Sequence, residues 1–561
     1  MRTTNTEDGE LADLNTTAPP AAVDSADVAD AGLYVRKSSG LVRELGTREA
    51  FALNMAGVNL AGGIGFFFFI ILAGFPGTDL TWPIVISLAG AAVLSAAYSQ
   101  LAATMPRSGA DFVYLSRIFN PAIGAAAGVA LFAFLMLNLA VNATELANTY
   151  IPSVFQTLGE VFHSHGLTTF AADLGHKGPT IAVAAVILVG VATLMSRHVG
   201  LIARVMFGGF VVAFLATLVI IIEFAVHGHG AFVRGFDAHA GRSHAYAQIL
   251  AAAHHSRVAT GVHWSAVLSS LALVFGLYLG ATYANINGGE LRRAARTFRM
   301  STFLSLGISF VLVLLAWLTL RGMAGLSFLQ SSSYLSANDS ALYGKLAGNV
   351  TSYVPSYLLV VAGDPVSKIF VTLGYAVGQF TIVIVCALAA SRLLFALAFD
   401  RVLPTRVADV RAKSHIPVNA IAIVVLLGAG LIYLTIETTV LTATRNSYLM
   451  VSAVFALSSL AAALTPLRRR DLYQRSPKML GRDILGVPAV TWLGTLSALF
   501  WIYATYAGAT KTQVSGGYST SSVIVLACMS LGGAACYLVS KYNMRRRGLD
   551  LSMAMQELPP E

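Results

Sequence analysis

The chain has 561 residues, of which 56% are hydrophobic and only 11% are charged. Soluble proteins carry about 25% charged residues, so these few charges cannot cover a water-facing surface of this size. The composition excludes a soluble enzyme, a disordered chain and a nucleic-acid-binding protein as descriptions of the whole chain, and it indicates a protein largely surrounded by lipid. The net charge of +10 does not indicate a nucleic-acid partner, because the basic residues follow the expected membrane topology.

Residues 1–47 form a polar N-terminal segment. The first forty are rich in Ala, Thr and Asp and lack the apolar stretch of a cleaved signal peptide. We therefore expect a disordered tail on the cytoplasmic side of the membrane.

From residue 48 onward, apolar runs that can cross a hydrocarbon core about 30 Å thick follow one another. We expect an all-α membrane protein with about twelve transmembrane helices. The runs are continuously apolar rather than alternating, which excludes a transmembrane β-barrel. In chain order, the expected spans are 48–72, 82–104, 121–150, 179–196, 201–226, 264–287, 300–320, 366–399, 417–436, 447–466, 487–508 and 520–540.

The basic residues test the orientation of these spans. With the N-terminus on the cytoplasmic side, all but nine of the 37 Lys and Arg residues fall on inner segments. Such an excess predicts cytoplasmic N- and C-termini in a multi-pass protein of the cytoplasmic (inner) membrane. The nine outer residues are Lys177, Arg234, Arg242, Arg257, Arg321, Lys345, Lys368, Arg445 and Lys511.

Glycines interrupt the first and the sixth spans. Span 1 contains Gly57 and the sequence GGIG at 62–65, and span 6 contains Gly276 and Gly280. Two broken helices five spans apart are typical of an inverted repeat that binds its substrate near the membrane midplane. The amide end of a broken helix suits a carboxylate, and the carbonyl end suits an ammonium group or a metal cation. Glycines that only allow close helix packing would give the same pattern.

Span 3 carries a polar stripe. Asn138, Asn142 and Glu145 follow the spacing of one helix face, which cannot face lipid. The stripe either hydrogen-bonds to a neighbouring helix or lines a cavity, and Glu145 should lie toward the outer mouth. Span 8 carries Tyr375 and Gln379 four residues apart.

Two long outer connections, 151–178 and 227–263, contain ten of the twelve histidines. A metal site or a pH sensor is one interpretation. A solvated loop of biased composition is the other, and we favour it because the histidine spacings match no ligand pattern. The sequence also contains no HExxH, GxSxG or phosphate-loop motif, so we do not expect an enzyme.

Several short motifs occur in an order that resembles the amino acid permeases of the amino acid–polyamine–organocation (APC) superfamily. The resemblance covers about residues 41–561. Its motifs are LVRELG at 41–46, ALN at 52–54 with GIG at 63–65, YSQL at 98–101, MPRSGADFVY at 105–114, GE at 289–290, SRLLFA at 391–396 with DRVLP at 400–404, RDLY at 470–473 and ELPPE at 557–561.

The resemblance implies a five-plus-five inverted-repeat (LeuT-like) core with two extra C-terminal helices. The transport core would cover 48–466, an inner loop with spans 11 and 12 would cover 467–540, and 541–561 would be a cytoplasmic tail. The stretch 107–114 would be a structural inner loop. The function implied is transport by alternating access.

The resemblance also implies positions for the substrate. The backbone of Gly63, Ile64 and Gly65 would meet its carboxylate, although the serine common between the span 1 glycines is absent when the break is aligned at 62–64. Carbonyls near Gly57 and along the stretch from Phe275 to Leu279 would take the amino group. The substrate-binding candidates are therefore Gly57, Gly63, Ile64, Gly65, Asn138, Phe275, Gly276, Leu279, Gly280 and Cys386.

We expect a secondary active transporter that imports a neutral amino acid or a related small amine. The central parts of spans 6 and 8 contain no tryptophan, which argues against a cationic substrate held by stacking. A transporter-like sensor and a membrane-embedded enzyme are the competing classes. Their signalling domain and their catalytic cluster, respectively, are not found in the sequence.

The coupling ion is the least constrained feature. Some proton-driven relatives carry a lysine in span 5, whereas residues 201–226 contain none. We expect proton coupling through a carboxylate such as Glu145. Sodium bound between span 1 carbonyls and Ser391, or amine exchange without an ion, are the alternatives. We expect no cofactor and no metal site. The expected partners are the small-molecule substrate and the lipid bilayer, with no nucleic acid; the sequence does not specify the oligomeric state.

Overall fold

The computed structural model describes residues 42–348, 350–411, 416–438, 447–477, 483–510 and 520–548, together with Leu551 and Met555. The predicted N-terminal tail lies outside these residues up to position 41, and so does most of the chain beyond 548.

Ten helical segments within the described residues are long and apolar enough to cross a membrane. They begin and end within a few residues of predicted spans 1–10, except that the third runs to Val161. The segments are Thr47–Gly74 (α2, α3, η1 and α4), Thr81–Thr104 (α5), Pro121–Val161 (α7, η2 and α8), Lys177–Met195 (α10), Val199–Val226 (α11), Trp264–Ile286 (α14, α15 and η3), Ala294–Ala324 (α16), Pro365–Phe399 (α20), Val418–Glu437 (α21) and Val451–Arg468, the main part of α22 (Ser447–Arg468).

Helices α24 (Ala489–Thr510) and α25 (Thr520–Arg545) occupy the positions predicted for spans 11 and 12. The expected all-α membrane architecture is therefore confirmed. The shorter elements are α6 (Asp111–Ile118), α9 (His165–Leu174), α12 (His229–His239), α13 (Ala245–His255), η4 (Gly288–Glu290), α17 (Leu326–Asn338), α18 (Ser340–Ala347), α19 (Val354–Val361), η5 (Thr405–Ala408), α23 (Arg470–Arg475) and the two-stranded hairpin β1 (Asp483–Ile484) and β2 (Val487–Pro488).

The residues at helix starts explain where long segments begin. Asn120 lies before α7, and its side-chain oxygen accepts a hydrogen bond from the Ala122 amide at 2.8 Å. Asp364 caps α20 in the same way through the Ser367 amide, also at 2.8 Å. A proline follows each cap at the first helical position, where no amide hydrogen is needed.

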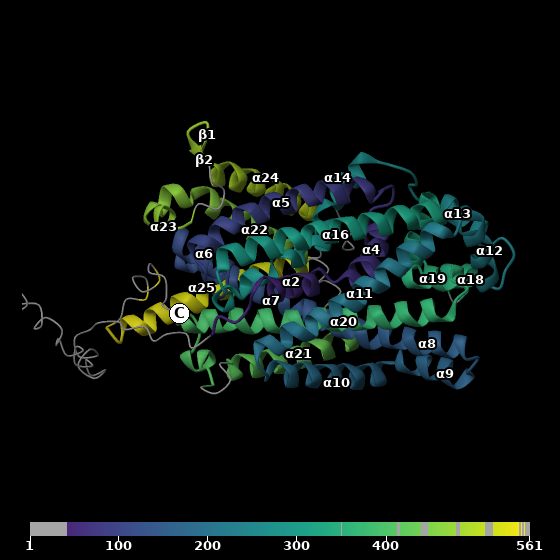
Figure 1. Ribbon diagram of the computed structural model, residues 1–561, viewed down its shortest axis with the longest axis horizontal. Coiled ribbons are helices and arrows are strands. Elements are labelled where there is room, and N and C mark those ends of the chain that lie inside the picture. Colours follow the sequence, from purple (N-terminus) through teal and green to yellow (C-terminus); the bar gives the residue numbers. More distant parts are fainter. Residues whose placement is uncertain are drawn as a thin grey trace, which may run out of the picture.

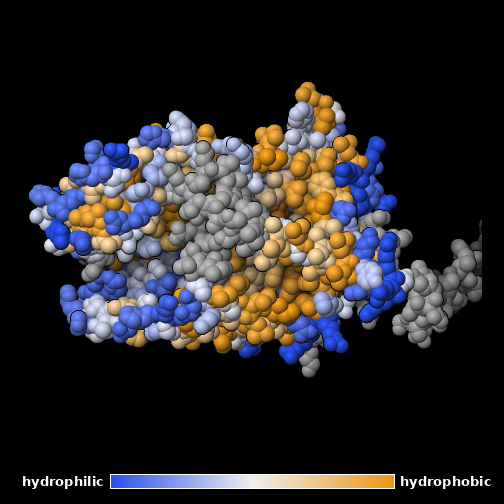
Figure 2. Space-filling model, turned by 180° about the vertical axis from the view of Figure 1, so that it is seen from behind, coloured by the Kyte–Doolittle hydropathy of each residue, from blue (hydrophilic) through white to orange (hydrophobic). Residues whose placement is uncertain are grey.

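The long helices run side by side along the long axis of the molecule (Figure 1). Helices α8, α9, α12, α13 and α17–α19 gather at one end, which we call the cap end. Helices α6 and α23 and the last turns of α25 lie at the other, which we call the tail end. Figure 2 shows hydrophobic surface concentrated between two hydrophilic ends, as expected for a chain that crosses a bilayer.

The cap end is helical, whereas we expected long loops there. Helices α12, α13, α17 and α19 share an aromatic core in which the ring of Phe328 stacks on Tyr246 at 4.4 Å and meets Phe236 edge-on at 5.0 Å. Tyr357 also joins this core; burial raises its pKa to about 12, so its hydroxyl stays protonated and shares a 2.9 Å hydrogen bond with Ser332. The prediction missed these helices because hydropathy detects long apolar runs, not short amphipathic ones.

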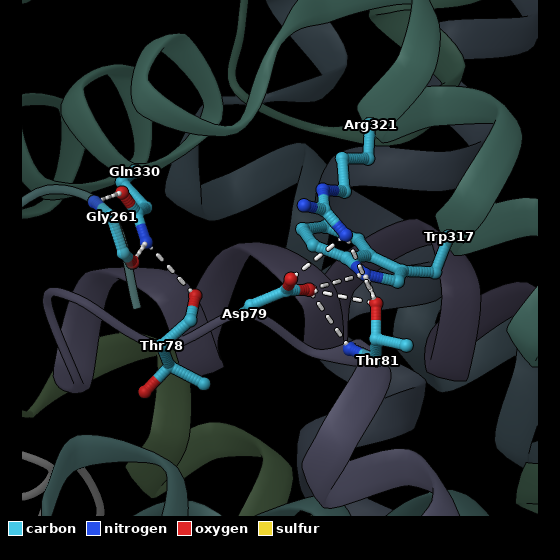
Figure 3. A network of polar contacts seen from close by, with 7 residues as sticks. All are labelled: Thr78, Asp79, Thr81, Gly261, Trp317, Arg321 and Gln330. Carbon is cyan, nitrogen blue, oxygen red and sulfur yellow. Dashed lines mark hydrogen bonds and ion pairs between the residues drawn. The ribbon is translucent and has the colours of Figure 1, made fainter. Parts of the chain in front are cut away.

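A buried carboxylate in the connection between α4 and α5 ties α5 to α16 (Figure 3). Asp79, between α4 and α5, accepts hydrogen bonds from the Trp317 indole at 3.0 Å and from the Thr81 hydroxyl at 2.8 Å. It also pairs with Arg321 at 2.8 Å. Because Asp79 is almost fully buried, these contacts replace its lost hydration.

The same figure shows how α17 is attached to the connection before span 6. The amide nitrogen of the Gln330 side chain donates to the carbonyl oxygens of Thr78 at 3.0 Å and Gly261 at 2.8 Å. Its side-chain oxygen accepts the Gly261 amide at 2.8 Å. The ends of spans 1, 2, 6 and 7 are thereby held as one unit with α17.

We predict that Asp79→Ala lowers the free energy of unfolding by about 1–3 kcal/mol, because Arg321 loses its counter-ion and the Trp317 N–H keeps only the Thr81 hydroxyl as acceptor. Chemical unfolding of the purified protein in mixed micelles measures the loss. Asp79→Asn keeps an acceptor for the indole and should lose clearly less. Equal stability of Asp79→Ala and the wild type would contradict this role.

Candidate functional site

The first spanning helix is interrupted at Asn59. Helix α2 (Thr47–Val58) ends there, and α3 (Leu60–Gly62) restarts the segment. Asn59 has φ 50° and ψ 70°, the left-handed region that asparagine tolerates better than most residues. Its side-chain oxygen accepts the Gly62 amide at 3.1 Å. The glycine pattern predicts the break at 62–65, whereas in the structure the interruption lies at Asn59 and Gly63–Phe67 (η1) forms a widened helical turn.

A chain of side-chain amides joins this interruption to spans 3 and 8. The Asn59 amide group donates to the Gln379 oxygen at 2.9 Å. The Gln379 amide group donates to the Asn142 oxygen at 2.9 Å and to the Glu145 carboxylate at 3.1 Å. Asn59 and Gln379 are buried, so this chain supplies polar partners where lipid and water supply none. The polar stripe of span 3 therefore does both things that its sequence allowed. Asn142 and Glu145 hydrogen-bond to Gln379 on a neighbouring helix, and Glu145 also lines a cavity.

A cavity of about 430 Å³ extends from the cap end to the turn that follows the interruption. Helix α8 (Ile151–Val161) and η2 (Leu146–Tyr150) line one side, α19 and the residues before it line the other, and Gly65 and Phe66 lie at the span 1 side. Apart from its tyrosines, its polar lining residues are Glu145, Asn148, Thr149, Ser153, Gln156, Glu160, His239, Thr351, Ser356 and Thr372.

The charge of this cavity favours an ammonium group. Glu145 and Glu160 are its carboxylates, and no Lys or Arg occurs among the described residues that line it. Phe66, Tyr353 and Tyr375 add aromatic rings, whose faces attract cations. A low-dielectric recess with negative charge concentrates positively charged groups at its mouth.

Other predicted site residues lie outside this cavity. A Cβ atom on Gly280 would lie 1.8 Å from the Gly57 carbonyl carbon, so the backbones of spans 1 and 6 touch at this pair, as the packing interpretation expects. Phe275 packs edge-on against Trp501, with ring centres 4.1 Å apart, and Cys386 is fully buried.

The remaining candidates are distributed between the buried core and the helix surfaces. Gly63, Ile64 and Leu279 are buried and Gly276 is half-buried. Asn138 donates to the carbonyl oxygen of Phe134, one turn earlier in its own helix, at 3.1 Å. Of the ten predicted substrate-binding residues, only Gly65 lines the cavity.

The tail end is closed by a clasp around the end of span 6. Glu290 and Arg392 form a buried ion pair at 2.8 Å. The Leu45 amide donates to the Glu290 carbonyl at 2.9 Å, and the Arg292 amide donates to the Leu45 carbonyl at 2.8 Å. Ser391 belongs to the same cluster, since its hydroxyl donates to the Leu388 carbonyl and accepts from Arg392 at 3.3 Å.

The inner connection that contains MPRSGADFVY completes the clasp. The Gly109 amide donates to the Ile286 carbonyl at 3.0 Å, and the Tyr114 hydroxyl donates to the Asn285 side-chain oxygen at 2.7 Å. Three buried polar atoms here have no hydrogen-bond partner within the described chain: Asn285 Nδ2, Asn287 Oδ1 and Glu290 Oε2. Each such atom lowers the stability of the closed end by about 1–3 kcal/mol. Hydrogen bonds to water would remove this cost if the end opened.

Comparison with known proteins agrees with this architecture. A family profile described as an amino acid permease matches residues 45–533. No curated protein matches the chain.

We predict that Glu290→Gln loosens the clasp, because it leaves the buried Arg392 charge without a counter-ion. Amide hydrogen exchange in peptides that contain Leu45, Gly109 and Arg292 should accelerate at least about tenfold, the factor that corresponds to 1.4 kcal/mol. Mass spectrometry of the purified protein measures this rate.

Glu223→Gln is the matched control for the clasp. It removes a carboxylate that lies 3.4 Å from His227 at the cap end and should leave tail-end exchange unchanged. Exchange in Glu290→Gln at the wild-type rate would show that the ion pair does not hold this end closed.

Proposed function

This chain belongs to the amino acid permease family, whose members carry amino acids across a membrane, and from that premise we propose that it imports a neutral amino acid or a related small amine by alternating access. The observation that carries the proposal is the asymmetry of the two ends. A cavity runs from the cap end to span 1, while the clasp closes the tail end. A transporter in one of its two access states has this form.

The direction of import follows from charge. The tail end carries Arg468, Arg469, Arg470 and the run at 545–547, and basic segments of this kind face the cytoplasm. The cap end and its cavity then face outward. Substrate would enter from outside and leave through the clasp into the cytoplasm.

We propose that the substrate binds at the turn after the interruption. The two glycines of this turn carry no side chain that would block a carboxylate from the backbone of Gly63, Ile64 and Gly65. The Gly63 amide donates to the Asn59 carbonyl at 2.7 Å in this state, so the substrate carboxylate would replace that bond as it binds. The amino group would face the carbonyls of span 6 near Phe275 to Leu279 once the cavity has closed around the substrate. Asn138 and Cys386 would become substrate neighbours in that closed state.

A small amine without a carboxylate is the second candidate substrate. Glu145 and Glu160, with the aromatic rings beside them, supply charge and ring faces for an ammonium group but no cation for a carboxylate.

Uptake into liposomes that contain the purified protein tests the proposal. A panel of labelled neutral amino acids, cationic amino acids and amines separates the two candidates. Uptake of none of these compounds, by protein that is shown to be folded and inserted, would refute the proposed function.

Proton coupling through Glu145 is the mechanism that we propose for energy input. One proton that moves down 100 mV supplies about 2.3 kcal/mol, more than the 1.4 kcal/mol needed for tenfold accumulation. Glu145 contacts Gln379, which contacts Asn59, so a change of charge on the carboxylate reaches the interruption through two hydrogen bonds. The Arg392 guanidinium beside Ser391 disfavours a sodium ion at that hydroxyl.

We predict that Gly65→Leu abolishes uptake without unfolding the protein. An added Cβ would lie 3.4 Å from the Tyr150 hydroxyl and the Tyr375 ring, so the rest of a leucine side chain must enter the cavity. Initial uptake rates and size-exclusion profiles are the measurements. Gly190→Leu, on α10, is the control, because nothing lies within 4 Å of its added Cβ. Normal uptake by Gly65→Leu would remove the turn from the binding site.

We predict that Glu145→Gln abolishes proton-driven accumulation of substrate but keeps the exchange of substrate across the membrane. The carbonyl oxygen of glutamine can still accept from Gln379, but the side chain no longer titrates. Accumulation under an inward pH gradient without sodium should fall at least about tenfold, the equivalent of 1.4 kcal/mol. Counterflow exchange should stay within a few-fold of wild type.

Glu160→Gln removes the other cavity carboxylate and should keep proton-driven accumulation. If Glu145→Gln also keeps it, the proton is carried elsewhere. If the wild type accumulates substrate only under a sodium gradient, proton coupling is refuted.

A further inference from the structure

A second cavity lies at the tail end, far from the cavity that opens at the cap end. It has a volume of about 700 Å³ and lies where the junction of α6 and α7 meets α25. Arg469, just before α23, also lines it. None of these residues takes part in the clasp or lines the proposed substrate path.

The polar lining of this cavity is basic. Arg117, Arg469 and Lys541 contribute cationic groups, and no Asp or Glu is found among the described residues that line it. Two carboxylates nearby offset part of the charge: Asp400 pairs with Arg117 Nη1 at 2.6 Å, and Asp471 pairs with Arg469 at 3.3 Å. Arg469 contacts both oxygens of Asp471, each at 3.3 Å, and the Asp471 side chain is 55% exposed. Three cationic groups against two carboxylates leave the cavity with one net positive charge.

Arg117 supplies the observation that points to a ligand. Its side chain is fully buried and lines the cavity, yet its Nε and Nη2 atoms have no hydrogen-bond partner within the described structure. A guanidinium has five N–H donors arranged for planar oxyanions such as carboxylate and phosphate. Leaving buried donors unpaired is costly, so an oxyanion in this cavity would be bound with favourable geometry and charge.

The start of α7 (Pro121–Glu145) adds a second source of positive potential. Asn120, Pro121 and Ala122 line the same cavity, and α7 has 25 residues. The N-terminus of a long helix carries a partial positive charge. The Ala122 amide already donates to Asn120 and Pro121 has no amide hydrogen, so α7 adds this potential but no hydrogen bond of those two residues.

The position and the apolar lining suit a phospholipid headgroup. The cavity lies at the tail end, where span 3 begins and span 12 ends. The ends of spanning helices lie at the expected depth of lipid headgroups. Phe119, Pro121 and Leu538 line it beside the basic groups, and Leu538 is exposed on the surface of α25. Basic pockets between spanning helices on the cytoplasmic side bind anionic headgroups in other membrane proteins.

We propose that this cavity is a phosphate-binding site, which holds the phosphate of an anionic phospholipid headgroup or of a free phosphate ion. The site is independent of the transported substrate and would stabilise the junction of α6, α7 and α25. Arg469 and Lys541 are the residues to test, because Arg117 also neutralises the buried Asp400 and its loss would disturb folding.

The test compares wild type with the double variant Arg469→Gln/Lys541→Gln. Native mass spectrometry of the purified protein in detergent, titrated with phosphatidylglycerol or phosphatidylcholine, measures binding of each lipid. We expect phosphatidylglycerol to be retained over phosphatidylcholine, and the double variant to bind it at least about tenfold more weakly, given about 1 kcal/mol for each basic residue near the membrane surface.

The matched control is Arg470→Gln/Arg545→Gln. It removes the same charge from exposed residues of the same end that do not line the cavity, and it should weaken phosphatidylglycerol binding less than about threefold. Arg469 also donates to the Arg117 carbonyl at 3.1 Å, so its replacement could disturb the local fold. The single variant Lys541→Gln leaves this bond intact and separates loss of charge from misfolding. It should weaken binding by an intermediate factor.

A second arm identifies the source of the phosphate. If inorganic phosphate, added to lipid-depleted protein, raises the melting temperature of wild type but not of Arg469→Gln/Lys541→Gln, the site accepts a free phosphate. Selective binding of phosphatidylglycerol without that shift assigns the site to a lipid headgroup. Equal weakening in both double variants, or no response to either probe, would overturn the proposal.

Discussion

The central constraint on this protein is that a helix interrupted inside a membrane must find new partners for its backbone and polar side chains. Asn59 meets this constraint in two ways. It adopts the left-handed conformation, and its side chain both accepts the Gly62 amide and donates to Gln379. The contacts of span 1 with span 3 and with span 8 meet at this one residue, through Asn142 at 3.4 Å and Gln379 at 2.9 Å. The interruption is therefore part of a packed polar network, not a local defect.

The two ends of the molecule differ: the cap end contains a cavity, and the tail end is packed shut. At the cap end, Asp79 and Gln330 attach the ends of spans 1, 2, 6 and 7 to α17, while the cavity lies between α19 and the arm formed by η2 and α8. At the tail end, the Glu290–Arg392 pair and backbone bonds to Leu45 hold span 6 closed. The unpaired polar atoms in the clasp reduce its net stability.

The charge distribution separates three roles. Carboxylates line the cavity at the cap end, a neutral chain of amides connects it to span 1, and basic residues dominate the tail end. Arg117, which lines the basic cavity, pairs with Asp400 inside the protein and keeps two buried donor atoms without a hydrogen-bond partner among the described residues. The two proposed sites lie at opposite ends of the same helix, since α7 begins at the basic cavity and ends at Glu145.

The sequence by itself determined the class of protein and the positions of its spans, because hydropathy and chain length act locally. The ordered motifs pointed to the same family as the profile that matches residues 45–533. Tertiary structure alone decided the site. Glu145 and Gln379 are 234 residues apart, and Asn59 and Gln379 are 320 apart, so no local pattern could pair them. Glycine spacing predicts a break at Gly63–Gly65, but the helix is interrupted at Asn59. There the asparagine side chain accepts the Gly62 amide and donates to Asn142 and Gln379, which lie on two other helices.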